Sequence, residues 1–143
     1  MEVLMNYTRT GNDIMLRVDR GEKVMASIAK VAEKENIKAG FVSGIGAVDQ
    51  AELSYFEVEK DGYNTINFEE DFEVLSLNGT LSYVDNKPHQ HVHMILGRED
   101  FSTIGGHLQE ATVSITLEVH ITVLDTEVNR KPDDKYTIQT LDI

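Results

Sequence analysis

The chain has 143 residues, of which 41% are hydrophobic and 27% charged, and these values are typical of a soluble globular protein of about one domain. It contains no cysteine, which excludes a disulfide framework and a thiolate metal site. The formal net charge of −12, from 13 Lys and Arg against 25 Asp and Glu, argues against nucleic-acid binding, because that binding depends on Lys and Arg that neutralise phosphates.

The same sequence gives expectations for organisation and location. We find no internal repeat or linker, so residues 1–143 are expected to form a single domain. No apolar run approaches the ~20 residues of a membrane span, and the N-terminal residues lack the pattern of a signal peptide. We therefore expect a cytoplasmic protein with no membrane partner. The densest basic segment, residues 130–135, is diluted by acids.

The first part of the chain predicts a strand pair followed by one helix. Residues 3–9 and 13–18 have the composition of strands, with a turn at 10–12 between them. From about residue 21 to 35, apolar side chains recur at helical spacing and charged side chains occupy the other positions. Asp19, with Glu22 three residues later, is the expected N-cap. Asn36 is the expected end of this helix.

The rest of the chain predicts strands. A strand at 51–57, preceded by an apolar segment at 41–43 and glycines at 44 and 46, pairs with residues 63–70 through a turn at 60–62. Asn78-Gly79 signals a turn or bulge between strands at 72–77 and 80–84. A turn at 85–88 leads to a strand at 89–96, followed by strands at 112–124, with apolar residues from Val113 to Val123 on one face, and at 135–142. One or two helices with eight or nine strands indicate an α+β fold with a mostly antiparallel sheet.

Alternating histidines on one predicted strand are the strongest chemical signal. His89, His91 and His93 share one face of this strand, because successive side chains alternate. The backbones of His91 and His93 lie roughly 7 Å apart, and their imidazoles can converge on one ion at a Zn–N distance of about 2.0–2.1 Å. We predict that this pair binds one divalent metal ion per chain, and that the ion is zinc.

The third ligand has two candidates. His107 follows Gly105-Gly106, glycines that let a backbone turn sharply and approach closely, and it is the preferred choice. His89 is the alternative, but histidines 89, 91 and 93 together span roughly 13 Å of strand, which fits one tetrahedral ion poorly. Three histidines without cysteine are typical of open zinc sites, in which water or substrate takes the fourth position. Without a metal, the histidines would be an exposed strand feature.

The sequence does not identify a catalytic residue. Glu118 and Glu110, and more weakly Glu52, are candidate acids or bases for chemistry at such a site. His120 shares the polar face of its strand with Glu118, and the pair could orient a ligand. We favour the alternative, in which His120 lies on a half-buried sheet face or subunit contact.

Several ordered motifs resemble the PPC (plants and prokaryotes conserved) domain, over about residues 5–143. The main one runs from His91 to Asp100 and on through Ile104-Gly105-Gly106-His107-Leu108, and segments 41–48 and 73–80 are similar too. The resemblance implies an α+β fold, a homotrimer, and His-x-His and Gly-Gly-His motifs that map onto His91, His93 and His107. It also implies a fold like that of acetolactate decarboxylase, which holds zinc with three histidines. The Arg-Gly-Arg-Pro core of the AT-hook, which contacts DNA in the plant members, does not occur here.

Two functional hypotheses follow. The first is a homotrimeric metalloprotein with an open three-histidine zinc site, acting as an enzyme on a small carbonyl-containing substrate. The second is a non-catalytic binding, regulatory or DNA-associated assembly domain in which the metal is structural. An open position beside a perturbed carboxylate would favour the first, and unfolding on metal removal would favour the second.

Overall fold

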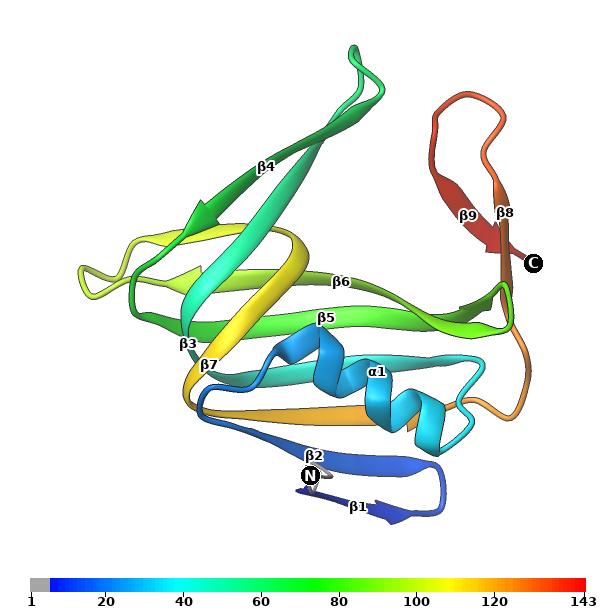
Figure 1. Cartoon of the computed structure of the whole chain (residues 1–143), viewed down its shortest axis with the longest axis horizontal. Helices are drawn as coiled ribbons and strands as arrows, with labels where there is room; N and C mark the ends of the chain where they lie inside the picture. Colours follow the sequence, from blue (N-terminus) through cyan, green and yellow to red (C-terminus); the bar gives the residue numbers. More distant parts are fainter. Residues whose placement is uncertain (1–5) are drawn as a thin grey trace.

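The structure, a computed structural model, describes residues 6–143 and consists mainly of strands with one helix (Figure 1). The elements in chain order are β1 (Asn6–Thr10), β2 (Asp13–Asp19), α1 (Val24–Lys34), β3 (Gly40–Glu57), β4 (Gly62–Phe68), β5 (Phe72–Val84), β6 (Lys87–Gly97), β7 (Thr103–Val123), β8 (Asn129–Pro132) and β9 (Gln139–Asp142). The predicted α+β class with one main helix is confirmed, and the second helix does not occur in the part of the chain described. Residues 3–5 of the first predicted strand lie outside that part.

Two long strands, β3 and β7, organise the sheet. They pair with each other over most of their length, and Figure 1 shows both curving through the molecule. Strand β5 pairs with β3, β6 with β5, and the first residues of β7 with β6, so these pairings close into a circuit. Strands β2 and β1 extend the sheet beyond β7, and β4 pairs with the second half of β3. These pairings are all antiparallel, and one parallel pair, Tyr83 with Asn129, joins β8 to β5.

The core lies between α1 and the inner face of the sheet. The helix buries the apolar side chains that the sequence places at helical spacing, namely Val24, Ile28, Val31 and Ala32. On β6 the buried side chains are Val92, Met94 and Leu96, which alternate with the histidines. Each fully buried aliphatic side chain of this kind contributes about 1.5–3 kcal/mol. The core therefore fixes which face of β6 carries the histidines.

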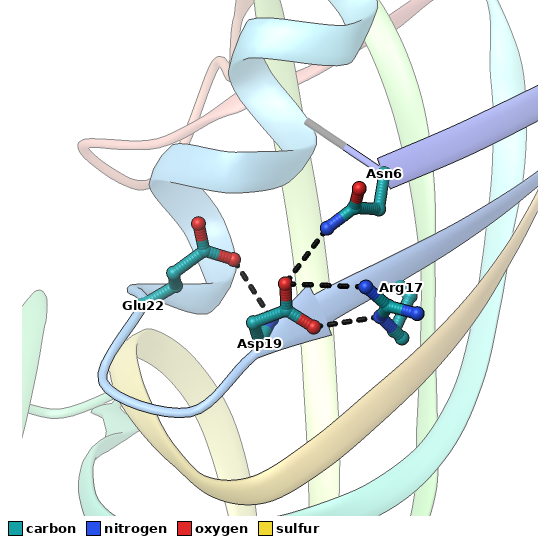
Figure 2. Close-up of polar contacts among 4 residues, drawn as sticks. All are labelled: Asn6, Arg17, Asp19 and Glu22. Atoms are coloured by element: carbon teal, nitrogen blue, oxygen red, sulfur yellow. Dashed lines mark hydrogen bonds and ion pairs between the residues drawn. The ribbon is translucent and has the colours of Figure 1, made fainter. Parts of the chain in front are cut away.

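The start of the helix differs from the prediction. Helix α1 begins at Val24 with Lys23 as the N-cap, and no side chain caps it from that position. Asp19 instead ends β2, where its carboxylate accepts hydrogen bonds from Asn6 and Arg17 (Figure 2). Its backbone N–H donates to the Glu22 carboxylate at 2.8 Å. The Asp19–Glu22 spacing therefore marks a turn before the helix.

A distant strand supplies the missing cap. The Glu110 carboxylate on β7 accepts hydrogen bonds from the backbone N–H groups of Met25 and Ala26, at 2.7 and 3.2 Å. A negative charge at this end of a helix satisfies free N–H groups and complements the helix dipole. At the other end, Asn36 has φ of 52°, which confirms the predicted end of the helix.

One predicted interruption is absent, because Asn78-Gly79 lies within continuous β5. Residues 41–46 belong to β3, whose register against β5 shifts between Gly44 and Gly46. A Cβ at Gly79 would overlap the carbonyl oxygen of His91 and would lie 2.8 Å from Cγ2 of Val92. This glycine thus permits the close approach of β5 and β6. Glycine is common both in turns and where two backbones approach closely, and the sequence alone does not distinguish the two cases.

The last third of the chain also differs from the prediction. Strand β7 begins at Thr103, well before residue 112. Ile115, expected on the apolar face, is 63% exposed, because the register of β7 shifts against β3 around Val48 and breaks the alternation. Of the predicted strand at 135–142, residues 139–142 are confirmed as β9, whereas residues 135–138 belong to the turn that joins β8 to β9 and that the Asp133 carboxylate holds. No helix within residues 6–143 has the length and apolar character needed to span a bilayer.

Candidate metal centre

The structure brings together the three histidines predicted as ligands. His91 and His93 project from the outer face of β6, and His107 on β7 is the direct pairing partner of His93. One ring nitrogen from each histidine lies within 4.8 Å of the other two, and the Nε2 atoms of His91 and His93 are 3.2 Å apart. Tetrahedral zinc with Zn–N of about 2.0–2.1 Å separates its ligand nitrogens by roughly 3.3–3.4 Å. His91, His93 and His107, together called the three-histidine cluster, therefore lie close enough to one another to hold one metal ion.

Close strand packing positions His107. Gly105 and Gly106, expected to allow a sharp turn and a close backbone approach, lie inside β7, where they serve the close approach. A Cβ at Gly105 would be 3.0 Å from the carbonyl oxygen of Met94 on β6, and one at Gly106 would be 3.0 Å from that of Ser54 on β3. These glycines allow β7 to lie close to both neighbours, which holds His107 opposite His93.

Tyr63 on β4 covers the side of the cluster. Its ring stacks on His107 with centroids 5.0 Å apart and planes at 26°. The Nδ1 atom of His107 is buried and has no hydrogen-bond partner among the described residues. A buried nitrogen left in this way carries a desolvation penalty, and coordination of a metal by this Nδ1 atom would offset it. The ring environment therefore fits a ligand role.

The electrostatics of the cluster favour neutral imidazoles. Burial, together with the charges of His93 and His107, lowers the pKa of His91 to about 4. Burial first, and then the charges of His93 and His89, also lowers the pKa of His107. Neutral rings at pH 7 keep the lone pairs that a metal needs.

The other two histidines lie outside the cluster. His89, the alternative third ligand, pairs with Ser82 on β5, and its pKa is lowered by burial and then by the charge of Arg130. His120 lies in a shallow groove with His91 and His93. Its Nε2 atom bonds the Asp13 carboxylate at 2.7 Å, so its partner is Asp13 instead of Glu118.

None of the candidate carboxylates joins the cluster. Glu110 caps α1, Glu118 pairs with Arg17 on β2 and Ile45 on β3, and Glu52 pairs with Glu110 and with Asn67 on β4. Within residues 6–143, the group able to hold a metal consists of the three histidines alone. The geometry therefore assigns no acid or base role to these glutamates.

Sequence reasoning missed Arg130. It lies on β8, and its guanidinium donates to Ser82 Oγ at 2.8 Å, to the Gln139 carbonyl at 3.1 Å and to Thr80 Oγ1 at 3.4 Å. Thr80 is the pairing partner of His91, so this cation lies beside the cluster. No spacing in the sequence connects residue 130 with residue 91, since the contact depends on how β8 crosses β5.

Comparisons with known proteins agree with this architecture. The sequence profile of the Plants and Prokaryotes Conserved (PCC) domain matches residues 5–125. A metal-containing protein from Archaeoglobus fulgidus is 33% identical with a TM-score of 0.86, and the match covers 98% of each chain. A protein from Bacteroides thetaiotaomicron is 22% identical with a TM-score of 0.94, and the match covers 98% of each chain. That protein is described as a candidate DNA-binding protein. Among curated proteins, none matches significantly.

A more distant similarity confirms the fold relation expected from the sequence. Acetolactate decarboxylase from Bacillus subtilis has a TM-score of 0.56 and 15% identity, and the match covers 89% of this chain and 58% of that chain. At this identity the similarity concerns the fold only.

Proposed function

The chain belongs to the Plants and Prokaryotes Conserved (PCC) domain family, and we propose that it is a homotrimeric protein that binds one zinc ion per chain through His91, His93 and His107. We propose further that the open side of this ion receives a small carbonyl-containing substrate. The observation that carries the proposal is the convergence of three imidazole nitrogens within 4.8 Å of one another.

Three features of the cluster support a metal. The spacing of the His91 and His93 nitrogens, 3.2 Å, is close to that of ligands on a tetrahedral ion. The lowered pKa of His91 and that of His107 keep these rings unprotonated at neutral pH. The Archaeoglobus fulgidus relative is named as metal-containing. Zinc is our choice because imidazole donors in a tetrahedral arrangement suit it, whereas copper and nickel more often take tetragonal sites.

Access to the cluster supports a reactive role. His91 and His93 line a groove of about 460 Å³ that also includes Ser43, Asn78 and Thr80. Zinc held by three histidines polarises a carbonyl or lowers the pKa of bound water to about 7. The hydroxyl and amide groups along the groove would orient a small polar substrate, and Tyr63 would limit its approach from the side of β4.

The proposed trimer has support on the same face. Six large apolar side chains of the outer face are between 48% and 63% exposed, namely Met15, Phe41, Ile45, Leu75, Ile95 and Ile115. Such a group of exposed apolar side chains is typical of a protein interface. With a chain mass of 16.1 kDa, sedimentation equilibrium should return three times that mass, and a monomer would contradict this part of the proposal.

Metal content tests the central part. We expect plasma mass spectrometry of untagged protein to find about one zinc per chain, and His93→Ala to lose it. The matched control is His120→Ala, which removes a histidine from the same groove that bonds Asp13 instead and should keep the metal. Zinc retained in His93→Ala would refute the ligand assignment.

The competing function is a non-catalytic assembly domain with a structural metal. The Bacteroides relative, with its DNA-related name, favours this alternative, whereas the net charge of −12 opposes nucleic-acid binding. Chelation separates the two hypotheses. If the metal is structural, the chain should unfold when the metal is removed. If the site is open as proposed, the metal-free protein should stay a folded trimer and should take up zinc again.

A further inference from the structure

Arg130 is a half-buried cation whose hydrogen bonds leave part of it free. Its three bonds, to Ser82, Gln139 and Thr80, use fewer N–H groups than a guanidinium has. All three acceptors are neutral oxygens. Burial lowers its pKa, as expected for a positive charge partly removed from water without a counter-ion.

Arg130 has no counter-ion although it is partly buried and the chain has 25 Asp and Glu against 13 Lys and Arg. Arg9, Arg17 and Arg98 pair with Glu35, Asp19 and Glu70. Arg20 also has no ion pair among the described residues, but its side chain is exposed to water. No carboxylate of residues 6–143 lies within ion-pair distance of Arg130. The site thus offers positive charge and free donors to an anion from outside the chain.

Arg130 and the three-histidine cluster occupy one face of the β5–β6 pair. Thr80, which accepts from Arg130, is directly opposite His91, and Ser82 is directly opposite His89. Side chains in such pairs have Cβ atoms about 4.5–5.5 Å apart. A small molecule could therefore contact both the guanidinium and the histidines.

The hairpin that carries Arg130 is fixed in place by contacts across the site. Its turn donates from Thr137 to the Asp61 carboxylate at the end of the β3–β4 hairpin, at 2.6 and 2.8 Å. The ring of Tyr136 packs edge-on against Phe56, with centroids 5.7 Å apart. Figure 1 shows both hairpins rising on the same side of β6. These contacts hold the guanidinium beside the cluster.

We infer that Arg130 binds the carboxylate of a small 2-oxo or 2-hydroxy acid whose oxo or hydroxyl oxygen faces the three-histidine cluster. This inference rests on the proposed function and specifies its substrate class. A planar guanidinium suits a carboxylate because it offers parallel N–H donors. Arg130 lies beyond residues 5–125 that the family profile matches, so the family assignment does not itself contain this site.

The test uses pyruvate as the probe and titration calorimetry of the zinc-loaded protein as the measurement. Loss of a charged hydrogen-bonding partner should weaken pyruvate binding about tenfold to hundredfold in Arg130→Gln, with zinc content unchanged. Arg130→Lys keeps the charge but loses the parallel N–H donors, so its affinity for pyruvate should lie between those of wild type and Arg130→Gln. The matched control is Lys131→Gln, which removes the same charge from the next residue, where Lys131 faces Asp142, and should bind pyruvate as wild type does.

Pyruvamide, the neutral analogue, separates charge recognition from binding at the metal. We expect it to bind wild type and Arg130→Gln equally weakly. Equal affinity of wild type and Arg130→Gln for pyruvate, or no preference for pyruvate over pyruvamide, would overturn the inference. If metal analysis finds no zinc, the proposed function fails separately. The same pyruvate titration on metal-free protein then tests the anion site by itself. Binding to wild type that is lost in Arg130→Gln would support the site, and no binding to wild type would refute it.

Discussion

Replacement of Gly79 by alanine tests how the sheet positions the metal centre. An added Cβ would overlap the carbonyl oxygen of His91 and would lie 2.8 Å from Cγ2 and 2.9 Å from Cα of Val92. Two of these three atoms belong to the backbone of β6, so no side-chain rotation relieves the clash. The strands must separate where His91 pairs with Thr80.

The expected loss of stability follows from this clash. Overpacking of a close-packed region destabilises by about 1–3 kcal/mol, and an effect at the upper end of that range is expected because backbone atoms must move. Since His91 is displaced with its strand, zinc affinity should fall as well. Urea unfolding followed by circular dichroism at fixed protein concentration gives the first quantity, and zinc titration of the folded protein gives the second.

Gly62→Ala is the matched control. Gly62 begins β4, and an added Cβ there would meet only the carbonyl oxygen of Lys60, at the ordinary distance of 3.9 Å. We expect its stability to stay within about 0.5 kcal/mol of wild type, with unchanged zinc binding. If Gly79→Ala matches Gly62→Ala in both measurements, the close approach of β5 and β6 does not position His91.

Three further predictions concern residues around the site. Glu110→Ala removes the cap of α1 and should lower the free energy of unfolding by about 0.5–2 kcal/mol, with zinc content unchanged; a loss of zinc from folded protein would instead place Glu110 in the metal centre. His89→Ala should retain zinc by plasma mass spectrometry, because its ring lies outside the three-histidine cluster, and complete loss would mean that His89 is a ligand. Hydrogen bonds from the Thr137 hydroxyl and then from its N–H lower the pKa of Asp61 below its ordinary 3.8. These bonds therefore stabilise the fold above pH 3.8, and that stabilisation is lost as the pH falls through the pKa of Asp61 in the folded protein. The amide resonance of Thr137 should therefore stay constant from pH 7 to about 4 and shift below it, and a shift near pH 6 would point to another group.

Local patterns in the sequence predicted a large part of this protein. Helical spacing located α1, and alternation placed the histidines of β6 opposite a buried face. The His-x-His spacing identified two members of the cluster, because residues two apart on a strand share a face whatever the strand pairs with. These features depend on neighbours within a few residues, so they can be inferred before the fold is known.

Only the tertiary structure decided how distant segments meet. Gly79, expected at a turn or bulge, instead permits the close approach of β5 and β6, and Glu110, a candidate acid or base, caps a helix far away in the sequence. The choice of His107 over His89 as the third member of the cluster follows from the register of β6 against β7, and the position of Arg130 follows from where β8 crosses β5. Strand pairing depends on contacts between residues that are far apart in the chain, and no local period encodes those contacts.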